Sequence, residues 1–128
     1  MPALPWQSVR PADPDREYLV LLTHLPLRAF WMIPRFLAYA QQIQRQLKSS
    51  RGLIGYSLLA RPLQKKFWTL SAWEDEGALM GFVQHPPHVQ TMSALAPQMG
   101  RPRFDRWHAK GGDIPPTWPD ALQRFDPG

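Results

Sequence analysis

The chain has 128 residues, 44% of them hydrophobic, so it has the length of one domain and enough apolar side chains for a core. It contains no cysteine, which excludes disulfides, thiolate zinc sites and thiol nucleophiles and is typical of a reducing compartment. No apolar run is long enough to cross a bilayer, and the first residues lack the pattern of a signal peptide. The sequence therefore predicts a cytoplasmic protein without membrane binding.

The formal net charge is +5, and it is unevenly distributed, because eight basic residues and no acidic one lie between Arg28 and Lys66. These cations fall at expected helix ends and turns, and the chain has no helix-turn-helix or zinc-finger pattern. A solvated basic face, or a site for a small anion, is therefore favoured over nucleic-acid binding.

Residues 1–15 contain four prolines, which interrupt both helix and sheet, so an arm on the surface is expected, with Trp6 as its anchor. The apolar run "EYLVLLTHL" that follows predicts a strand with both faces covered. Apolar residues then recur three and four apart from Ile33 to Leu47, with Pro34 in the first turn, which predicts a helix over residues 33–48.

Gly52 closes this helix, and "LIGYSLLARP" predicts a second strand with a bulge or a close backbone approach at Gly55. The next run, "KFWTLSAW", alternates so that Trp73 and Trp68 point to opposite faces of a third strand. These two strands should form a hairpin. The acidic residues 74–76 then mark the start of a second helix.

The sequence "HPPH" at residues 85–88 interrupts that helix, because neither proline can donate a backbone hydrogen bond. A new helical segment can begin at Pro86 or Pro87. Further on, "RPRFDRWHAK" alternates as a fourth strand, and residues 111–128 form a Pro/Gly-rich extension with one short helical turn.

This order predicts an α+β, ferredoxin-like βαββαβ sandwich over residues 16–110, in which a four-stranded antiparallel sheet carries two helices on one face. The other face of the sheet would then be bare, although its side chains are largely apolar. An exposed patch of that size predicts a second copy as partner, and hence a homodimer.

The segment "GLIGYSLLARPLQKKFWTLSAWEDEGALMGFVQHPPH" resembles the antibiotic biosynthesis monooxygenase-like proteins of the dimeric α/β-barrel superfamily. The resemblance extends from about Tyr18 to Lys110. It implies a homodimer whose two sheets pack into a barrel, with a pocket for a small hydrophobic or aromatic ligand between sheet and helices. The superfamily also contains heme-degrading oxygenases, polyketide cyclases and dehydratases, so the resemblance indicates fold more strongly than chemistry.

Three residues are candidates for catalysis. His88 is the predicted pocket base, a position that the resemblance supports, although a histidine that caps the helix break is the alternative. His24 ends the first strand and is either a second acid or base or an exposed strand-end residue. Arg106 stabilises an anion if its face of the fourth strand is inward, and otherwise pairs with an acidic neighbour at the surface.

Aromatic side chains are the candidates for substrate binding, namely Trp31, Tyr56 and Trp68, although such residues more often belong to a core. No metal site is predicted, because His85 and His88 would need a third ligand that the sequence does not supply nearby.

The resulting hypothesis is a cofactor-independent monooxygenase-like enzyme that acts on a phenolic or polyketide-like substrate. A cyclase or dehydratase, or a non-catalytic dimer that binds a hydrophobic ligand, would use the same parts. Heme degradation is not expected. The positions that carry the characteristic tryptophan and histidine of the heme-degrading look-alikes fall on Phe82 and Met92, and the chain contains no asparagine.

Overall fold

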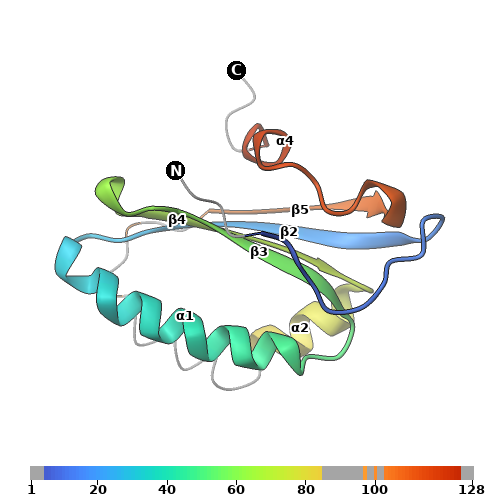
Figure 1. Ribbon diagram of the computed structural model, residues 1–128, viewed down its shortest axis with the longest axis horizontal. Coiled ribbons are helices and arrows are strands. Elements are labelled where there is room, and N and C mark those ends of the chain that lie inside the picture. Colours follow the sequence, from blue (N-terminus) through green and yellow to red (C-terminus); the bar gives the residue numbers. More distant parts are fainter. Residues whose placement is uncertain (1–4, 85–96, 98–99, 101–102, 125–128) are drawn as a thin grey trace.

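A computed structural model gives the fold of residues 5–84, 97, 100 and 103–124 as a five-stranded antiparallel sheet with helices packed against it (Figure 1). The strands are β1 (Gln7–Ser8), β2 (Glu17–Pro26), β3 (Leu53–Arg61), β4 (Lys66–Trp73) and β5 (Arg103–Lys110). The helices are α1 (Ile33–Lys48), α2 (Glu76–Gln84) and α4 (Trp118–Leu122), and the short 3-10 turns are η1 (Phe30–Met32), η2 (Pro62–Gln64) and η4 (Gly111–Asp113).

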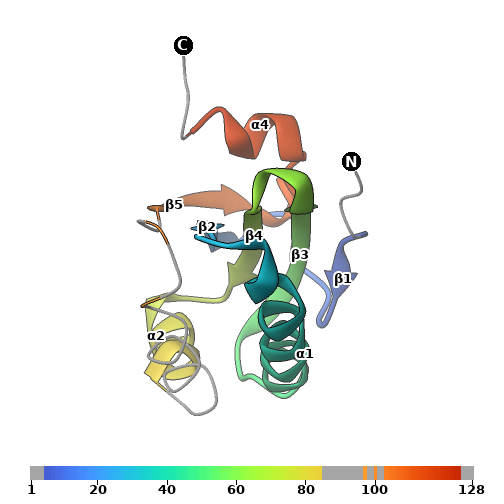
Figure 2. The same cartoon turned by 90° about the vertical axis from the view of Figure 1, so that its left-hand side faces the viewer.

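The four long strands follow the predicted ferredoxin-like topology. They lie in the order β3, β4, β2, β5, and every neighbouring pair is antiparallel. Both α1 and α2 lie on one side of this sheet, whereas α4 lies on the other side (Figures 1 and 2). The predicted α+β fold is thus confirmed, with the two-residue strand β1 as an additional edge that pairs with β3.

The first helix has the predicted bounds, because its sequence supplies both its ends and its buried face. Pro34 occupies the first turn, Phe36 and Leu47 are buried, and Arg45 and Lys48 lie in the last turn, where cations interact favourably with the helix dipole. After the helix, Gly52 adopts a φ of +81°, a left-handed conformation that side chains other than glycine rarely take.

The predicted bulge and close approach are both present at Gly55. The pairing of β3 with β4 shifts register between Leu53 and Gly55, and the indole of Trp6 lies where a Cβ on Gly55 would stand. The proline-rich arm is therefore anchored by Trp6 against the sheet, and β1 extends this anchor by pairing with Tyr56 and Gly55.

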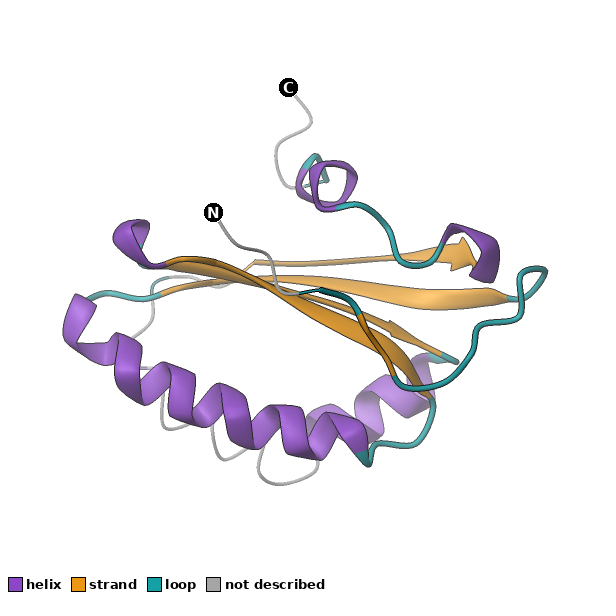
Figure 3. Cartoon of the chain, viewed as in Figure 1, coloured by secondary structure: helices purple, strands orange, loops and turns teal. Residues whose placement is uncertain are grey.

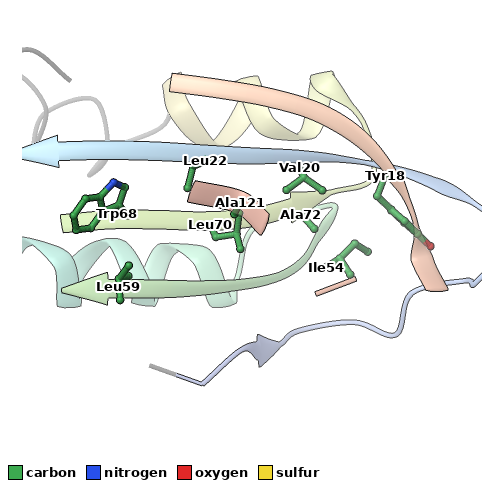
Figure 4. Close-up of a cluster of buried hydrophobic side chains, with 9 residues drawn as sticks. All are labelled: Tyr18, Val20, Leu22, Ile54, Leu59, Trp68, Leu70, Ala72 and Ala121. Carbon is green, nitrogen blue, oxygen red and sulfur yellow. The ribbon is translucent and has the colours of Figure 1, made fainter. Parts of the chain in front are cut away.

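The chain's own terminal segments cover the sheet face that is turned away from α1 and α2. Helix α4 contributes Ala121, Trp118 and Leu122, and the N-terminal arm contributes Trp6 and Ala12. The buried residues of this far-face cluster, drawn in Figure 4, are Tyr18, Val20, Leu22, Ile54, Leu59, Trp68, Leu70, Ala72 and Ala121. The expectation of a bare apolar face is thus wrong, because sequence reasoning assigned no packing partner to residues 111–128.

Helix α4 is fixed by polar contacts as well as by burial. Thr117 caps its start by accepting a hydrogen bond from the backbone of Asp120. Beyond its end, the Arg124 guanidinium lies 3.8 Å from the ring centroid of Trp107 and 3.9 Å from Asp105 Oδ2. The extension therefore holds a defined position on the sheet (Figure 3).

Within the described residues, no helix is long and apolar enough to cross a membrane. The predicted break at residues 85–88 and the helical segment after it lie outside the described residues.

Candidate functional site

A cavity of about 620 Å³ lies between the sheet and the helices α1 and α2. Its apolar wall comes from side chains of both helices and of β2, whereas its polar groups come mainly from the strands. The lining residues that matter below are Leu21, Thr23, Phe36, Tyr39, Ala40, Ile43, Tyr56, Thr69, Ser71, Trp73, Phe82 and Arg106. A space of this size is within the range of small-molecule sites.

The cavity exists because the core on the helix side is divided into two clusters. At one end Phe36 of α1 packs on Phe67 of β4, with ring centroids 4.4 Å apart. At the other end Trp73 of β4 packs on Phe82 of α2, with ring centroids 5.2 Å apart. Since the lining includes Phe36 as well as Trp73 and Phe82, the open space lies between the two clusters.

Small side chains keep the middle of this space open. On the sheet, Thr23 of β2 and Thr69 of β4 are direct cross-strand partners, and Leu21 is paired with Ser71. On α1, Ala40 stands in the stripe between the larger Phe36 and Ile43. A small residue facing small residues leaves unfilled volume, because a packed interior needs large side chains opposite small ones.

Among the hydroxyl groups on the floor of the cavity, those of Ser71 and Tyr56 can act as hydrogen-bond donors to a ligand. Trp73 Nε1 donates to Ser71 Oγ at 2.9 Å in a buried contact, so the Ser71 hydroxyl retains its own proton for donation to a ligand. Burial raises the pKa of Tyr56 above its usual value of 10, so this phenol is protonated near neutral pH. Ser71 and Tyr56 are cross-strand partners.

Arg106 supplies the positive charge at the cavity wall. It lies on β5 and forms an ion pair with Glu76 of α2, whose Oε1 is 3.0 Å from Arg106 Nη1. Both side chains are more than half exposed, so the pair is solvated. Of the two predicted environments for Arg106, the structure shows pairing with an acidic neighbour, at a place that also borders the cavity.

His24 and Trp68 lie on the opposite face of the sheet and do not line the cavity. They are cross-strand partners whose rings lie 4.9 Å apart. Burial, followed by the positive charges of Lys66 and Arg103, lowers the pKa of His24 below its usual value of 6.5. The strand alternation therefore separates these two residues from Tyr56 and Arg106, and Trp73 takes the place in the cavity that was expected for Trp68.

The family model for antibiotic biosynthesis monooxygenases matches residues 33–94. This segment contains α1, β3, β4 and α2, which provide the helix wall of the cavity and half of its floor. The resemblance to antibiotic biosynthesis monooxygenases that the sequence indicated is thus confirmed for this segment. Strands β2 and β5 and the α4 extension lie outside the matched segment.

Solved structures of such monooxygenase-like proteins share the fold. A mutant of SnoaB, a cofactor-independent oxygenase from Streptomyces nogalater, is 14% identical, with a TM-score of 0.60, over 80% of this chain and 97% of its own. A candidate antibiotic biosynthesis monooxygenase from Caulobacter crescentus is 15% identical, with a TM-score of 0.66, over 73% and 91%. Another from Nitrosomonas europaea is 11% identical, with a TM-score of 0.62, over 70% and 95%. No curated protein matches the sequence significantly.

The structure brings two of the six predicted site residues, Tyr56 and Arg106, to one cavity. Trp31 is 65% exposed in η1 and does not line it. His88 lies outside the described residues, so its role remains a prediction. Within the described residues, no group of three or more His, Asp or Glu side chains is placed to bind a metal ion.

Sequence reasoning missed Ala40, Ser71 and Tyr39 as cavity residues. A signal for two of them was present. Ala40 interrupts an otherwise bulky helix stripe, and Ser71 with Thr69 interrupts the bulky face of β4 that runs from Phe67 to Trp73. Small residues at facing positions of two packed elements indicate a cavity, although the sequence alone does not say which positions face each other.

Proposed function

We propose that the protein binds a small hydrophobic molecule between its sheet and helices, and that it is a cofactor-independent monooxygenase-like enzyme acting on a phenolic or polyketide-like substrate. The observation that carries this proposal is the cavity of about 620 Å³, whose helix side is mainly apolar and whose floor carries the hydroxyls of Ser71 and Tyr56. Such a lining suits a flat aromatic ligand with a few oxygen atoms.

The chemistry requires an acidic substrate C–H bond next to a phenol or carbonyl group. A base removes this proton, and the electron pair left on carbon is delocalised onto the oxygen as an enolate. The carbanion then gives electrons to dioxygen, so that a substrate CH₂ becomes C=O and the second oxygen atom leaves as water. The protein supplies the base, donors for the enolate oxygen and a site that excludes bulk water.

The donors in this proposal are Ser71, Tyr56 and Arg106. A protonated phenol and a hydroxyl whose oxygen already accepts from Trp73 can both donate to a developing oxyanion. Arg106 adds positive charge at the wall, shared with Glu76. The proposed base is His88. His24, Trp31 and Trp68 are not retained in the proposal, because they lie away from the cavity.

Two alternatives use the same cavity. A cyclase or dehydratase would need the proton transfers without dioxygen. A non-catalytic binding protein would need only the apolar walls, and it is favoured by one observation: among the described lining residues there is no histidine.

We also propose a homodimer and a cytoplasmic location. The dimer is supported by the family resemblance and not by a bare sheet face, because α4 and the arm cover that face. The location is supported by the absence of cysteine.

The test combines binding and turnover with a variant that fills the cavity. Ala40→Leu adds bulk to the cavity wall, and Ala38→Leu places the same change at an exposed position of the same helix. Binding of anthrone, a polycyclic substrate with an acidic CH₂ group, is followed by tryptophan quenching, and its oxidation by oxygen uptake. We expect Ala40→Leu to weaken binding about tenfold or more, with no change for Ala38→Leu.

Oxygen uptake by the native protein above the uncatalysed rate, together with loss of this excess in Ala40→Leu, would support the enzymatic function. Saturable binding without uptake would support the binding protein instead. Equal binding by the native protein and Ala40→Leu would contradict the cavity as the ligand site.

A further inference from the structure

Two turns meet at one end of the sheet. Turn η1 follows β2, and η2 joins β3 to β4. Because β2, β4 and β3 are antiparallel neighbours, both turns lie at the same end of these strands. Leu27 donates its backbone N–H to Lys65 O at 2.8 Å, and Lys65 Nζ donates to Arg28 O at 3.5 Å. In Figure 1 the two turns lie at the left, in cyan and light green. Residues 27–35, 61–66 and 103 are called the turn end below.

Three large apolar side chains at the turn end are exposed to solvent. Leu63 is 86% exposed, Trp31 65% and Phe30 55%. Their neighbour Met32 is buried in the cluster of Phe36 and Phe67, so the local backbone is fixed while the three side chains remain outside the core. Exposed apolar groups at adjoining turns are characteristic of an interaction surface.

Positive charge surrounds these side chains. The cations of the turn end are Arg28, Arg35, Arg61, Lys65, Lys66 and Arg103, and its residues include no aspartate or glutamate. Lys65 Nζ lies 5.1 Å from the ring centroid of Phe30. The opposite end of the sheet carries both signs of charge. Acidic residues 74–76 follow β4, whereas Arg16 precedes β2 and Glu17 is the cross-strand partner of Lys110. The excess of positive charge is therefore concentrated at the turn end.

We propose that the turn end is a docking surface for an anionic lipid bilayer. The charge is complementary to acidic headgroups, and tryptophan and phenylalanine favour the boundary between headgroups and acyl chains. Leu63 argues against nucleic acid as the partner, since an aliphatic side chain at the tip of a turn has nothing to stack on there. The contact is peripheral, and it revises the sequence-based expectation of no membrane binding. In this proposal Trp31, which does not line the cavity, contacts the bilayer instead.

Vesicle sedimentation of the full chain tests this proposal. The lipids are phosphatidylcholine alone, and phosphatidylcholine with about 30% phosphatidylserine, each at low and at physiological ionic strength. We expect the protein to sediment with the anionic vesicles, to remain in solution with the neutral ones, and to be released as salt is raised. A blue shift of tryptophan emission on anionic vesicles that is lost in Trp31→Ser would place this residue at the interface.

Charge and apolar contributions are separated by matched variants. Arg35→Glu with Lys66→Glu reverses two cations at the turn end, whereas Arg45→Glu with Lys48→Glu makes the same change in net charge near the far end of α1. The first pair should lower partitioning about tenfold or more, and the second only weakly, since the attraction falls off within about 10 Å. Leu63→Ser should lower partitioning, in contrast to Met80→Ser in α2.

Equal losses from the two charge pairs would show that net charge alone drives binding, and would overturn the proposal. Failure to sediment with anionic vesicles at low salt would overturn it as well. Tighter binding to a single-stranded oligonucleotide than to the vesicles, with the same variant pattern, would replace the bilayer by nucleic acid.

Discussion

Trp118 of α4 donates its indole N–H to Ser57 Oγ of β3 at 3.3 Å, a contact between residues 61 positions apart. The same indole packs on the far-face cluster. This side chain therefore attaches the C-terminal extension to the sheet face where a bare surface, and hence a dimer partner, was expected.

Replacing Trp118 tests how strongly the extension is held. We expect Trp118→Ala to lower the free energy of unfolding by about 2–4 kcal/mol, because it removes a large packed side chain. Trp118→Phe keeps most of the packing and loses the hydrogen bond, so its cost should be about 1 kcal/mol. Urea denaturation measures both values, and equal values for the two variants would mean that packing of the indole contributes little.

The same variants bear on the dimer. Light scattering on the native chain gives its mass, and loss of the α4 contact in Trp118→Ala exposes apolar surface on the sheet. If the native chain is monomeric and Trp118→Ala self-associates, α4 occupies the surface that would otherwise join two copies.

Gly55→Ala should destabilise the protein by about 1–3 kcal/mol, because the new methyl group meets the indole of Trp6. The matched control is Gly81→Ala in α2, where a Cβ would meet nothing within 4 Å. This control should stabilise the protein by about 0.5–1 kcal/mol, since alanine favours a helix over glycine. Thermal unfolding measures both, and a neutral Gly55→Ala would show that the arm moves away from the sheet easily.

Stability should depend on pH through His24. Its pKa in the folded state is lowered below 6.5 by burial and by the charges of Lys66 and Arg103, so the unfolded chain binds the proton more readily. This contribution to stability is therefore fully present above pH 6.5 and is lost as the pH falls toward the folded pKa.

His24→Gln should flatten this acid-side decline relative to the native protein. His108→Gln, which changes an exposed histidine on the neighbouring strand β5, serves as the control. Chemical denaturation between about pH 5 and 8 covers the window. A slope that His24→Gln leaves unchanged would assign the pH dependence to other groups.

The protein should not degrade heme. The position that carries tryptophan in the heme-degrading look-alikes is Phe82, which is buried against Trp73 and closes one end of the cavity. A Soret titration followed by reductant under air measures this. Binding of one heme per chain, followed by bleaching to a defined product, would contradict the assignment.

The sequence by itself determined the strand and helix order, and with it the fold. The apolar spacing of α1, the alternation of β4 and the acidic start of α2 are local patterns, and each is readable within one element. Right-handed connections then leave one compact arrangement for a βαββαβ chain. For the same reason the sequence correctly placed Trp73 and Trp68 on opposite faces.

Only the tertiary structure decided which face holds the cavity and what covers the other face. The alternation of side chains places His24 on one face of its strand and Tyr56 on one face of another. Whether the two residues share a face of the sheet depends on the register across β2, β4 and β3, and on the bulge at Gly55, which no local pattern fixes. The open volume beside Ala40 depends on Thr69 and Ser71 facing it from another element. The packing of Trp118 on Ser57 likewise joins distant segments, and contacts of this kind are set by the whole core rather than by neighbouring residues.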